Sequence, residues 1–335
     1  DHRDLHSLRR RQRQMCIRDS PNITEIYGAL HNPIYFDHVE HGRCISNIVF
    51  SDDLYEKILT IVELDDYVII DETNPCVKVD LRTPFFIARI AIDVPPVSKP
   101  TIDIRNLSAM KYLSIPRLIS LGALRIEEAA ALISSFINRG NILIIGPTGS
   151  GKTTLANALL CLSNPNWRLL IVEHLHELED LSTYGKIVHR YSIPPFSEKK
   201  DVLTNLLHRN PDLVFIGELL TKKHVEAYVF GCESGFQMIA TTHAKDLPSL
   251  IRKWEKWGVN LTDLSDITIV TTEKIERNNL TIRRVPKIVR ISDGKIVEAP
   301  YNGKAMDLLS SLSSVYSNSE VSQIVNKWWL NASSD

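Results

Sequence analysis

The chain has little cysteine, no long apolar run and almost no excess of either charge. Its five cysteines among 335 residues include none in a CxxC pattern or a Cys/His spacing that would hold zinc. We therefore expect reduced thiols rather than a disulfide or metal framework. No apolar run approaches the about 20 residues that span a bilayer. The sequence also has neither an internal repeat nor a low-complexity tract, which argues against a solenoid or a disordered chain.

The first 20 residues do not have the pattern of a folded segment. Arg10–Ser20 is strongly basic, and its back-translation resembles the transposase-side adapter of DNA sequencing libraries. Residues 1–6 match the flow-cell end of the same adapter, and residues 7–9 fall where its variable index would lie. We expect residues 1–20 to be a translated adapter, and the native chain to extend further at its N-terminus.

Without these 20 residues the formal charge changes. They carry six Arg and three Asp, so Lys+Arg falls from 39 to 33, Asp+Glu falls from 40 to 37, and the net charge moves from -1 to -4. The basic N-terminal arm is therefore no indication of a nucleic-acid partner.

The remaining length suggests two domains, because about 315 residues exceed one typical core. We predict an N-terminal α/β domain at 21–107, a core at 108–300 and a C-terminal helical segment at 301–335. The stretch "VPPVSKPTIDIR" reads as an interdomain connection or an edge segment, because it has three prolines in six positions. The C-terminal segment contains two helical patterns, 303–316 and 319–330.

Hydrophobic patterns place the other elements. A helix at 51–64 has Ser51 as its N-cap and an apolar face of Leu54, Ile58, Ile61 and Val62, and a helix at 126–140 closes on Gly140. Around the first helix lie β-like runs at 32–36, 65–71, 76–81 and 85–94. Further on, unalternated apolar runs separated by helical segments indicate a parallel sheet covered on both faces; they lie at 141–146, 168–173, 212–217 and 237–242.

The chemistry-bearing motif is "GPTGSGKTT", which follows the first of these apolar runs directly. It fits G-x-x-x-x-G-K-[ST], the phosphate-binding P-loop. Glycines let the backbone approach a phosphate, and the loop and helix N–H groups donate to it. Lys152 can reach the β- and γ-phosphates, and the Thr153 hydroxyl can ligate Mg²⁺. We expect ATP, bound with Mg²⁺, on Gly146, Pro147, Thr148, Gly149, Ser150, Gly151, Lys152, Thr153 and Thr154.

Three later strand ends carry polar residues. Glu218 ends one apolar run, where its carboxylate can orient or deprotonate the attacking water or hold Mg²⁺ through water. Glu173 and Glu177 follow another run, and Thr241, Thr242 and His243 end a third. Because the carboxyl ends of parallel strands share one sheet edge, we expect these side chains to meet at the P-loop.

Together these motifs resemble the secretion-ATPase superfamily, which includes motors of type II and type IV secretion, type IV pili and the archaellum. Its Walker A, Asp box, Walker B and His box match Gly146–Thr154, Glu173–Glu177, Leu207–Leu220 and Gly235–Ala244. The proline-rich stretch resembles the family's "PPVS…IRK" connection and is nearest to the archaeal and type IV secretion branches. The resemblance implies an α/β fold: a small N-terminal α/β domain joined to a RecA-like P-loop core with a mostly parallel sheet.

The resemblance also implies roles and partners. Glu218 would polarise water, Glu173 and Glu177 would assist with Mg²⁺ or water, and His243 would sense the γ-phosphate or couple subunits. Arg105 and Arg89 match N-terminal-domain arginines that face a neighbour's nucleotide, and Arg190 matches an arginine after the Asp box. The protein would be a homohexamer at the inner, cytoplasmic face of the membrane. It would act on a polytopic membrane platform protein and, indirectly, on pilin-like or secreted cargo.

Four positions depart from the family pattern, and two other functions remain open. His174, His208, Leu220 and Phe236 replace the family's Asp, two Arg and His. These replacements leave ATP binding intact but bear on turnover, so a nucleotide-gated scaffold is one alternative. The other is a nucleic-acid translocating ATPase, against which the corrected acidic balance argues. A small-molecule kinase is disfavoured because no Arg-rich lid follows Walker B.

Overall fold

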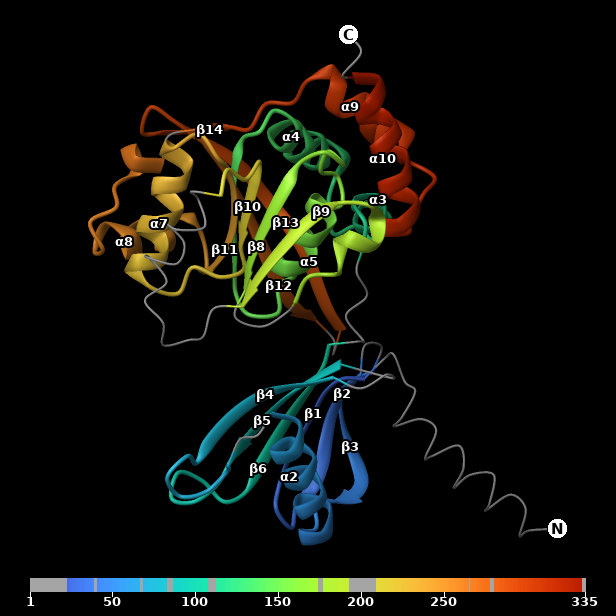
Figure 1. The fold of residues 1–335 in the computed structure, drawn as a ribbon, viewed down its shortest axis with the longest axis vertical. Helices are drawn as coiled ribbons and strands as arrows, with labels where there is room; N and C mark the ends of the chain where they lie inside the picture. The colour runs from blue at the N-terminus through green and yellow to red at the C-terminus, as the bar shows by residue number, and fades with distance from the viewer. Residues whose placement is uncertain are drawn as a thin grey trace, which may run out of the picture. The chain divides into compact units, whose positions relative to one another are not determined.

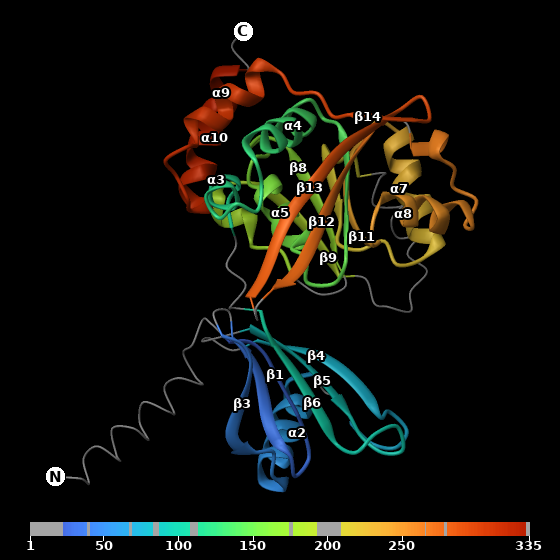
Figure 2. The ribbon, with the colours of Figure 1, turned by 180° about the vertical axis from the view of Figure 1, so that it is seen from behind.

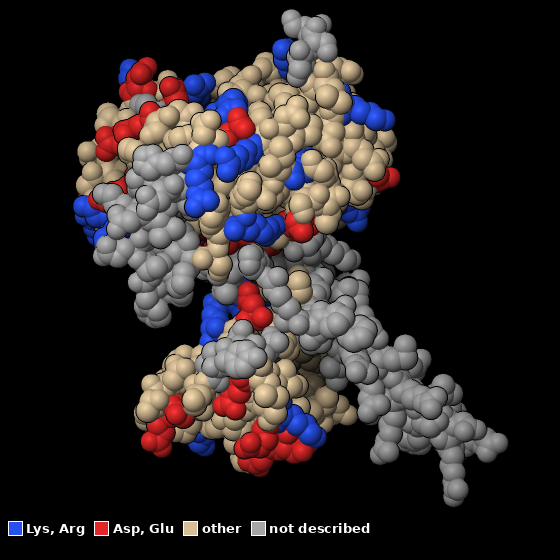
Figure 3. Space-filling view, in the orientation of Figure 1, with Lys and Arg blue, Asp and Glu red and all other residues tan. Residues whose placement is uncertain are grey.

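A computed structural model describes residues 23–38, 41–66, 69–82, 87–107, 113–173, 177–192, 209–264, 266–277 and 280–332. The predicted adapter segment, residues 1–20, lies outside the described residues. The chain divides into two compact units, residues 1–111 with 276–281 and residues 112–275 with 282–335 (Figure 1). The visible face of each unit carries side chains of both charges (Figure 3).

In its described part, the first unit is a six-stranded antiparallel sheet with helix α2 on one of its faces. The strand order is β3-β2-β1-β6-β5-β4. Its elements are β1 (Ile23–Ala29), β2 (Pro33–His38), β3 (Gly42–Val49), α2 (Asp52–Asp66), β4 (Cys76–Arg82), β5 (Ile87–Asp93) and β6 (Thr101–Asn106).

Helix α2 begins as predicted. The Ser51 hydroxyl accepts from the Leu54 N–H at 3.4 Å, and Val62 is buried against the sheet core. Leu54 and Ile58 are partly buried in the same cluster, whereas Ile61 is 48% exposed and does not belong to the inner face. The inner face also includes Tyr55 and Leu59, so the predicted face was displaced to one side of the row Leu54, Ile58 and Val62.

Two predictions for this unit are wrong. Among the described residues of 65–71 no strand forms, and Ile69 and Ile70 lie in the connection between α2 and β4. The proline-rich stretch joins β5 to β6 of one sheet, and β6 is a central strand paired with β1 and β5. It is thus neither a connection between units nor an edge segment. Prolines fit there because the turn needs no ladder hydrogen bonds, which begin again at Thr101.

The second unit contains an eight-stranded mixed sheet in the order β14-β13-β12-β7-β11-β10-β8-β9. The strands from β12 to β9 are parallel, and β14 is antiparallel to β13. The strands are β7 (Asn141–Gly146), β8 (Arg168–Glu173), β9 (Ile187–Ser192), β10 (Leu213–Ile216), β11 (Gln237–His243), β12 (Ile267–Arg277), β13 (Leu280–Ser292) and β14 (Lys295–Glu298).

Helices cover both faces of this sheet, as the unalternated strands predicted (Figures 1 and 2). One face packs on α3 (Ile115–Ser120), α4 (Ile126–Ile137), α5 (Lys152–Leu160), α9 (Gly303–Ser311) and α10 (Asn318–Ala332), with the short η1 (Leu181–Tyr184). The other packs on α7 (Lys222–Glu233) and α8 (Leu247–Glu255), with η2 (Leu261–Leu264). Strand β7 shows why: Ile142 and Ile144 belong to the first cluster, and Leu143 and Ile145 belong to the second. No helix in the described part of the chain is both long and apolar enough to cross a bilayer.

The end of α4 differs from the predicted glycine cap. The left-handed residue is Arg139, with φ of 60°, and the Gly140 N–H donates to the Ser135 carbonyl at 2.8 Å. Gly140 is required for a different reason, since a Cβ there would lie 2.6 Å from the Ser135 Oγ. Arg139 tolerates its backbone because its guanidinium binds Asp212, with Nη1 to Oδ1 at 3.3 Å.

Candidate nucleotide-binding site

The P-loop joins the end of β7 to the start of α5. Gly149 and Gly151 have φ of 72° and 93°, a region that side chains with a Cβ rarely adopt. Gly151 is the N-cap of α5 and has no side chain to satisfy the first helical N–H groups. These N–H groups and the helix dipole therefore remain available to an anion.

Lys152 lies in the concavity of this loop. Its Nζ donates to the carbonyls of Gly146 and Pro147, each at 2.9 Å, and lies 3.3 Å from the Nδ1 of His243. Burial lowers the pKa of Lys152 below its ordinary value, while Glu218 and Glu177 act in the opposite direction. A cation held by weak carbonyl partners can exchange them for a phosphate.

Glu218 and His243 lie on neighbouring parallel strands and contact each other. Glu218 follows the end of β10, and the Nε2 of His243 at the end of β11 contacts its Oε1. Because an ammonium only donates, the His243 Nδ1 facing Lys152 is the acceptor, which leaves the ring proton on Nε2, the nitrogen that contacts Glu218. The side chains therefore form a row, Lys152–His243–Glu218, as the shared sheet edge predicted.

The segment after β10 is fixed to β11 by two threonines. The Thr241 hydroxyl donates to the Gly217 carbonyl, and the Thr242 hydroxyl donates to the Leu219 carbonyl at 2.9 Å. The Leu219 N–H in turn donates to the Thr241 carbonyl at 2.8 Å. These bonds on both sides of Glu218 fix the backbone that carries its carboxylate.

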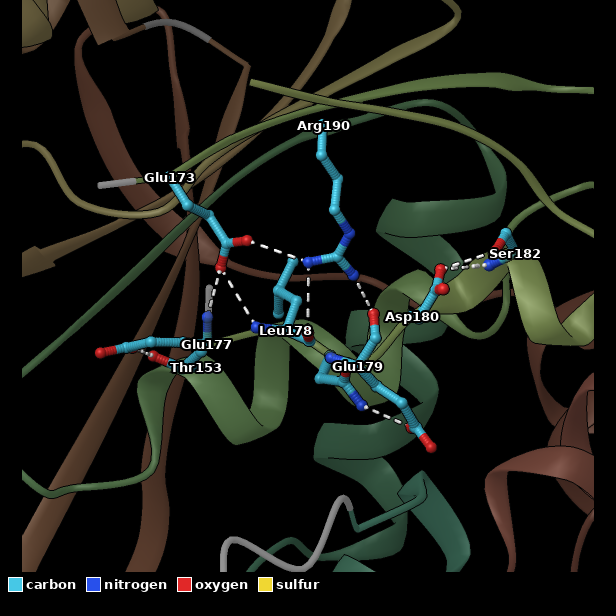
Figure 4. Close-up of polar contacts among 9 residues, drawn as sticks. Thr153, Glu173, Glu177, Leu178, Glu179, Asp180, Ser182 and Arg190 are labelled. Atoms are coloured by element: carbon cyan, nitrogen blue, oxygen red, sulfur yellow. Dashed lines mark hydrogen bonds and ion pairs between the residues drawn. The ribbon is translucent and has the colours of Figure 1, made fainter. Parts of the chain in front are cut away.

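The acidic loop after β8 reaches the P-loop helix through Glu177. The Thr153 hydroxyl donates to the Glu177 Oε2 at 2.9 Å (Figure 4). A hydroxyl next to a carboxylate, beside a phosphate-binding loop, is the oxygen donor set that Mg²⁺ takes together with phosphates and water. The residues present therefore fit a magnesium ion.

Glu173, at the end of β8, anchors this loop through its backbone. Its Oε1 accepts the N–H groups of Glu177 and Leu178, each at 3.1 Å, and its Oε2 lies 3.2 Å from the Arg190 Nη1 (Figure 4). Burial raises the pKa of Glu173 to about 7, against the opposing effect of Arg190. Glu173 is thus placed to hold the backbone that carries Glu177. His174, one of the four departures, lies outside the described residues.

Arg190 is engaged within its own chain. Besides Glu173, it donates to the Leu178 carbonyl at 3.2 Å and to the Glu179 carbonyl (Figure 4). Its side chain is only 20% exposed. It therefore closes the acidic loop around Glu173.

Arg89 and Arg105 lie in the first unit, opposite each other on β5 and β6. Cross-strand register places both arginines in a line of charged residues on the sheet face opposite α2. We call this line the charged row; it consists of Asp80, Arg89, Arg105, Glu25, Asp37 and Arg43. Arg89 is buried and its Nε donates to Asp80 at 3.0 Å. Arg105 is 43% exposed, and its Nη2 lies 2.5 Å from Glu25.

The sequence model of type II/IV secretion system proteins matches residues 78–293, which is well over half of the chain. This chain belongs to the type II/IV secretion system protein family.

The chain is also similar to individual proteins, in sequence or in structure. An uncharacterized protein, MJ0781 of Methanocaldococcus jannaschii, is 31% identical over 205 residues, which cover 57% of this chain but 28% of the relative. The probable conjugal transfer protein TrbB of Sinorhizobium fredii is 25% identical over 299 residues, covering 87% of this chain and 88% of the relative. The crystal structure of the Legionella pneumophila ATPase DotB has the same fold, with a TM-score of 0.60, 18% identity and coverage of 95% and 87%.

The structure describes two of the family departures, Leu220 and Phe236. Leu220 is exposed, and its backbone N–H donates to the His224 Nδ1 at 3.1 Å. Phe236 packs against the core cluster under α7 and α8. Asp212 of the Walker B segment caps the start of β8, because its Oδ2 accepts the Arg168 N–H at 2.9 Å. His208 lies outside the described residues.

Several residues that reach the site carry no sequence motif. The Thr272 hydroxyl on β12 lies 2.7 Å from the Ser150 Oγ and donates to the Ile145 carbonyl at 3.0 Å. It also explains Gly146, because a Cβ there would lie 2.2 Å from the Thr272 Oγ1. The Arg283 Nε on β13 donates to the Gly149 carbonyl at 2.7 Å. Only the pairing of β12 with β7 brings this distant hairpin to the P-loop.

Proposed function

We propose that this chain is a Mg²⁺-dependent ATPase motor that drives protein secretion or assembly of a pilus-like or archaellum-like filament. The observation that carries the proposal is the row Lys152–His243–Glu218 beside the pair Thr153–Glu177, at one edge of a parallel sheet. Family membership and the family's fold support the same assignment.

In the proposed reaction, the P-loop N–H groups bind the β- and γ-phosphates. The Lys152 ammonium exchanges its carbonyl partners for the γ-phosphate. Thr153 and Glu177 would hold Mg²⁺, which when bound neutralises charge on the phosphate oxygens. Glu218 accepts a proton from water; the water oxygen bonds to the γ-phosphorus as the bond to the β–γ bridging oxygen breaks, giving ADP and phosphate. His243 links the two ends, because it touches both Lys152 and Glu218.

The larger assembly is also part of the proposal. The family resemblance supports a homohexamer at the inner face of the cytoplasmic membrane, whose cycle moves the N-terminal domain against the core. It would act on a polytopic membrane platform protein and, through it, on pilin-like or secreted cargo. The proposed domain limits remain 21–107, 108–300 and 301–335.

Two substitutions test the nucleotide chemistry. Lys152→Ala should abolish most thermal stabilisation by Mg·ATP, which for a ligand at 100 times its Kd amounts to about 2.7 kcal/mol. Glu218→Gln should keep that stabilisation but lower turnover by about 10²–10⁴-fold. Thermal unfolding and phosphate release measure the two effects.

Lys304→Ala, on the exposed start of α9, is the matched control and should change neither quantity. Unchanged stabilisation in Lys152→Ala would refute the P-loop assignment. Stabilisation of the wild type without any phosphate release would favour the nucleotide-gated scaffold instead.

A further inference from the structure

A second cation reaches the P-loop from β13. The Arg283 Nε donates to the Gly149 carbonyl at 2.7 Å. The Arg283 Cδ would lie 3.8 Å from a Cβ placed on Gly151, the residue that caps α5. The guanidinium therefore lies beside the two glycines whose backbone opens the loop to an anion. Lys274 on β12 comes within 3.9 Å of the corresponding point on Gly149.

The neighbouring arginine on the same strand behaves differently. Arg284 is paired with Glu273 of β12 through its Nε, and successive strand residues point to opposite faces. Among the residues that the structure describes, no carboxylate pairs with Arg283. Within the described residues, neither of its terminal amino groups has a hydrogen-bond partner on the protein. The two terminal amino groups of a rigid planar fork, with four N–H donors, thus remain for a ligand, and a phosphate is the group that such a fork suits.

Strand order places Arg283 on one particular side of the loop. Strand β7 lies between β11 and β12. On the β11 side, Lys152 meets His243 and Glu218, the groups proposed to act on the γ-phosphate and water. On the β12 side, Thr272 holds Ser150, and Arg283 holds Gly149. The guanidinium therefore flanks the loop opposite the hydrolytic residues.

We propose that Arg283 is a nucleotide-binding residue that contacts the phosphates retained in ADP, rather than the transferred γ-phosphate. This inference rests on the proposed ATPase function and deepens it. A contact with the retained phosphates is made equally in ATP and ADP, so it lowers both dissociation constants by the same factor and leaves the chemical step unchanged.

The test compares Arg283→Gln with the matched variant Arg284→Gln in the full chain, using Mg·ADP and Mg·ATP as probes. Arg283→Gln should raise the Kd for both nucleotides by a similar factor of about 10–100, the range of a charge-assisted hydrogen bond. Turnover at saturating ATP should stay within about threefold, and Arg283→Lys should recover part of the affinity. Arg284→Gln should leave both Kd values within about twofold.

A purely structural role for Arg283 makes a different prediction. In that case Arg283→Gln would lower the melting temperature of the nucleotide-free protein. Its ADP affinity would then depend on salt in the same way as that of the wild type. Removal of a phosphate contact should instead flatten the salt dependence of ADP binding. The inference is overturned if both Kd values match the wild type, or if turnover falls while ADP affinity is unchanged. If the wild type and Arg284→Gln bind no nucleotide, the proposed function itself is wrong.

Discussion

The two sheets of this protein present their charged residues in different ways. In the first unit, the charged row crosses the face of an antiparallel sheet, and its arginines are matched by carboxylates on adjacent strands, Arg89 by Asp80 and Arg105 by Glu25. In the second unit, Glu173, Glu218 and His243 stand at the ends of parallel strands. A face distributes charge over an area, whereas an edge brings it to one point.

This difference bears on which residues can be assigned a role from contacts within one chain, and which can be assigned a role only if they contact a second subunit. The groups at this sheet edge, which we call the edge cluster, are the P-loop, Glu173, Glu177, Arg190, Glu218 and His243, and contacts within the second unit link them. The charged row is balanced within itself, with three carboxylates and three arginines, and the described residues of its unit form no phosphate-binding loop. Within the row, Arg89 is buried and pairs with Asp80 on the adjacent strand, so it stabilises the sheet. Arg105 is half-exposed and can exchange Glu25 for another anion.

The largest expected effect concerns Arg105 and tests whether the charged row contributes to a neighbouring subunit's active site. If Arg105 completes a neighbour's site, Arg105→Ala should leave ATP binding within a few-fold but lower turnover by about 10²–10⁴-fold, as for arginines supplied in trans. Mixing it with Glu218→Gln subunits should restore some activity, because each variant lends the other an intact half-site. Steady-state phosphate release from mixed rings measures this.

A control for this test lies on the same sheet face. Arg43 is 71% exposed and paired with Asp37 at the other end of the row, so Arg43→Ala should leave turnover unchanged. If mixed rings stay inactive while both variants still assemble with wild-type subunits, Arg105 is only a surface ion pair. Its removal would then cost no more than about 1 kcal/mol of unfolding free energy.

A second, smaller effect concerns the edge cluster and its buried acid. Burial raises the folded-state pKa of Glu173 to about 7 from the ordinary 4.5, so the folded state binds its proton more tightly than the unfolded chain. The stabilisation this provides is fully present below pH 4.5 and is lost as the pH rises through 7. Relative to Glu173→Gln, whose side chain does not titrate, the wild type should lose about 2–3 kcal/mol of unfolding free energy between pH 5 and pH 8.

Denaturant unfolding of the wild type and Glu173→Gln at several pH values measures that difference. Glu233→Gln, at the exposed end of α7, supplies the matched control and should follow the wild type at every pH. A constant difference between the wild type and Glu173→Gln from pH 5 to 8 would mean that Arg190 and the two backbone N–H groups keep Glu173 ionised throughout.

Much of the edge cluster could be predicted because its signals are local. The P-loop follows its strand directly, and Glu173, Glu218 and His243 each end an apolar run. Parallel pairing then brings these ends together without further information. The order of motifs was enough to predict the family, which the sequence model confirms.

The remaining features depend on long-range packing that no local pattern records. Thr272 and Arg283 reach the P-loop only through the pairing of β12 with β7. The left-handed end of α4 falls on Arg139 because Asp212, 73 residues away, binds its guanidinium. The proline-rich stretch resembled a linker because prolines mark both linkers and strand connections, and only strand pairing distinguishes the two.

The smallest expected effect asks whether the C-terminal helix belongs to the edge cluster. Glu179, two residues beyond Glu177, accepts from Asn318 at the start of α10 at 2.8 Å and from Asn157 of α5 at 3.4 Å. The Asn318 side chain is buried and Glu179 is half-buried, so the loss of Asn318 leaves the Glu179 carboxylate with one fewer donor.

We expect Asn318→Ala to lower the unfolding free energy by about 1–2 kcal/mol, the range for losing a hydrogen bond to a charged group. Because Glu179 shares its loop with Glu177, the KM for Mg·ATP should rise about two- to threefold while kcat is nearly unchanged. Gln323→Ala, on the exposed face of α10, should cost less than about 0.5 kcal/mol and leave KM alone. Stability falling equally in both variants, with KM unmoved, would show that α10 merely covers the core and that the edge cluster ends at Arg190.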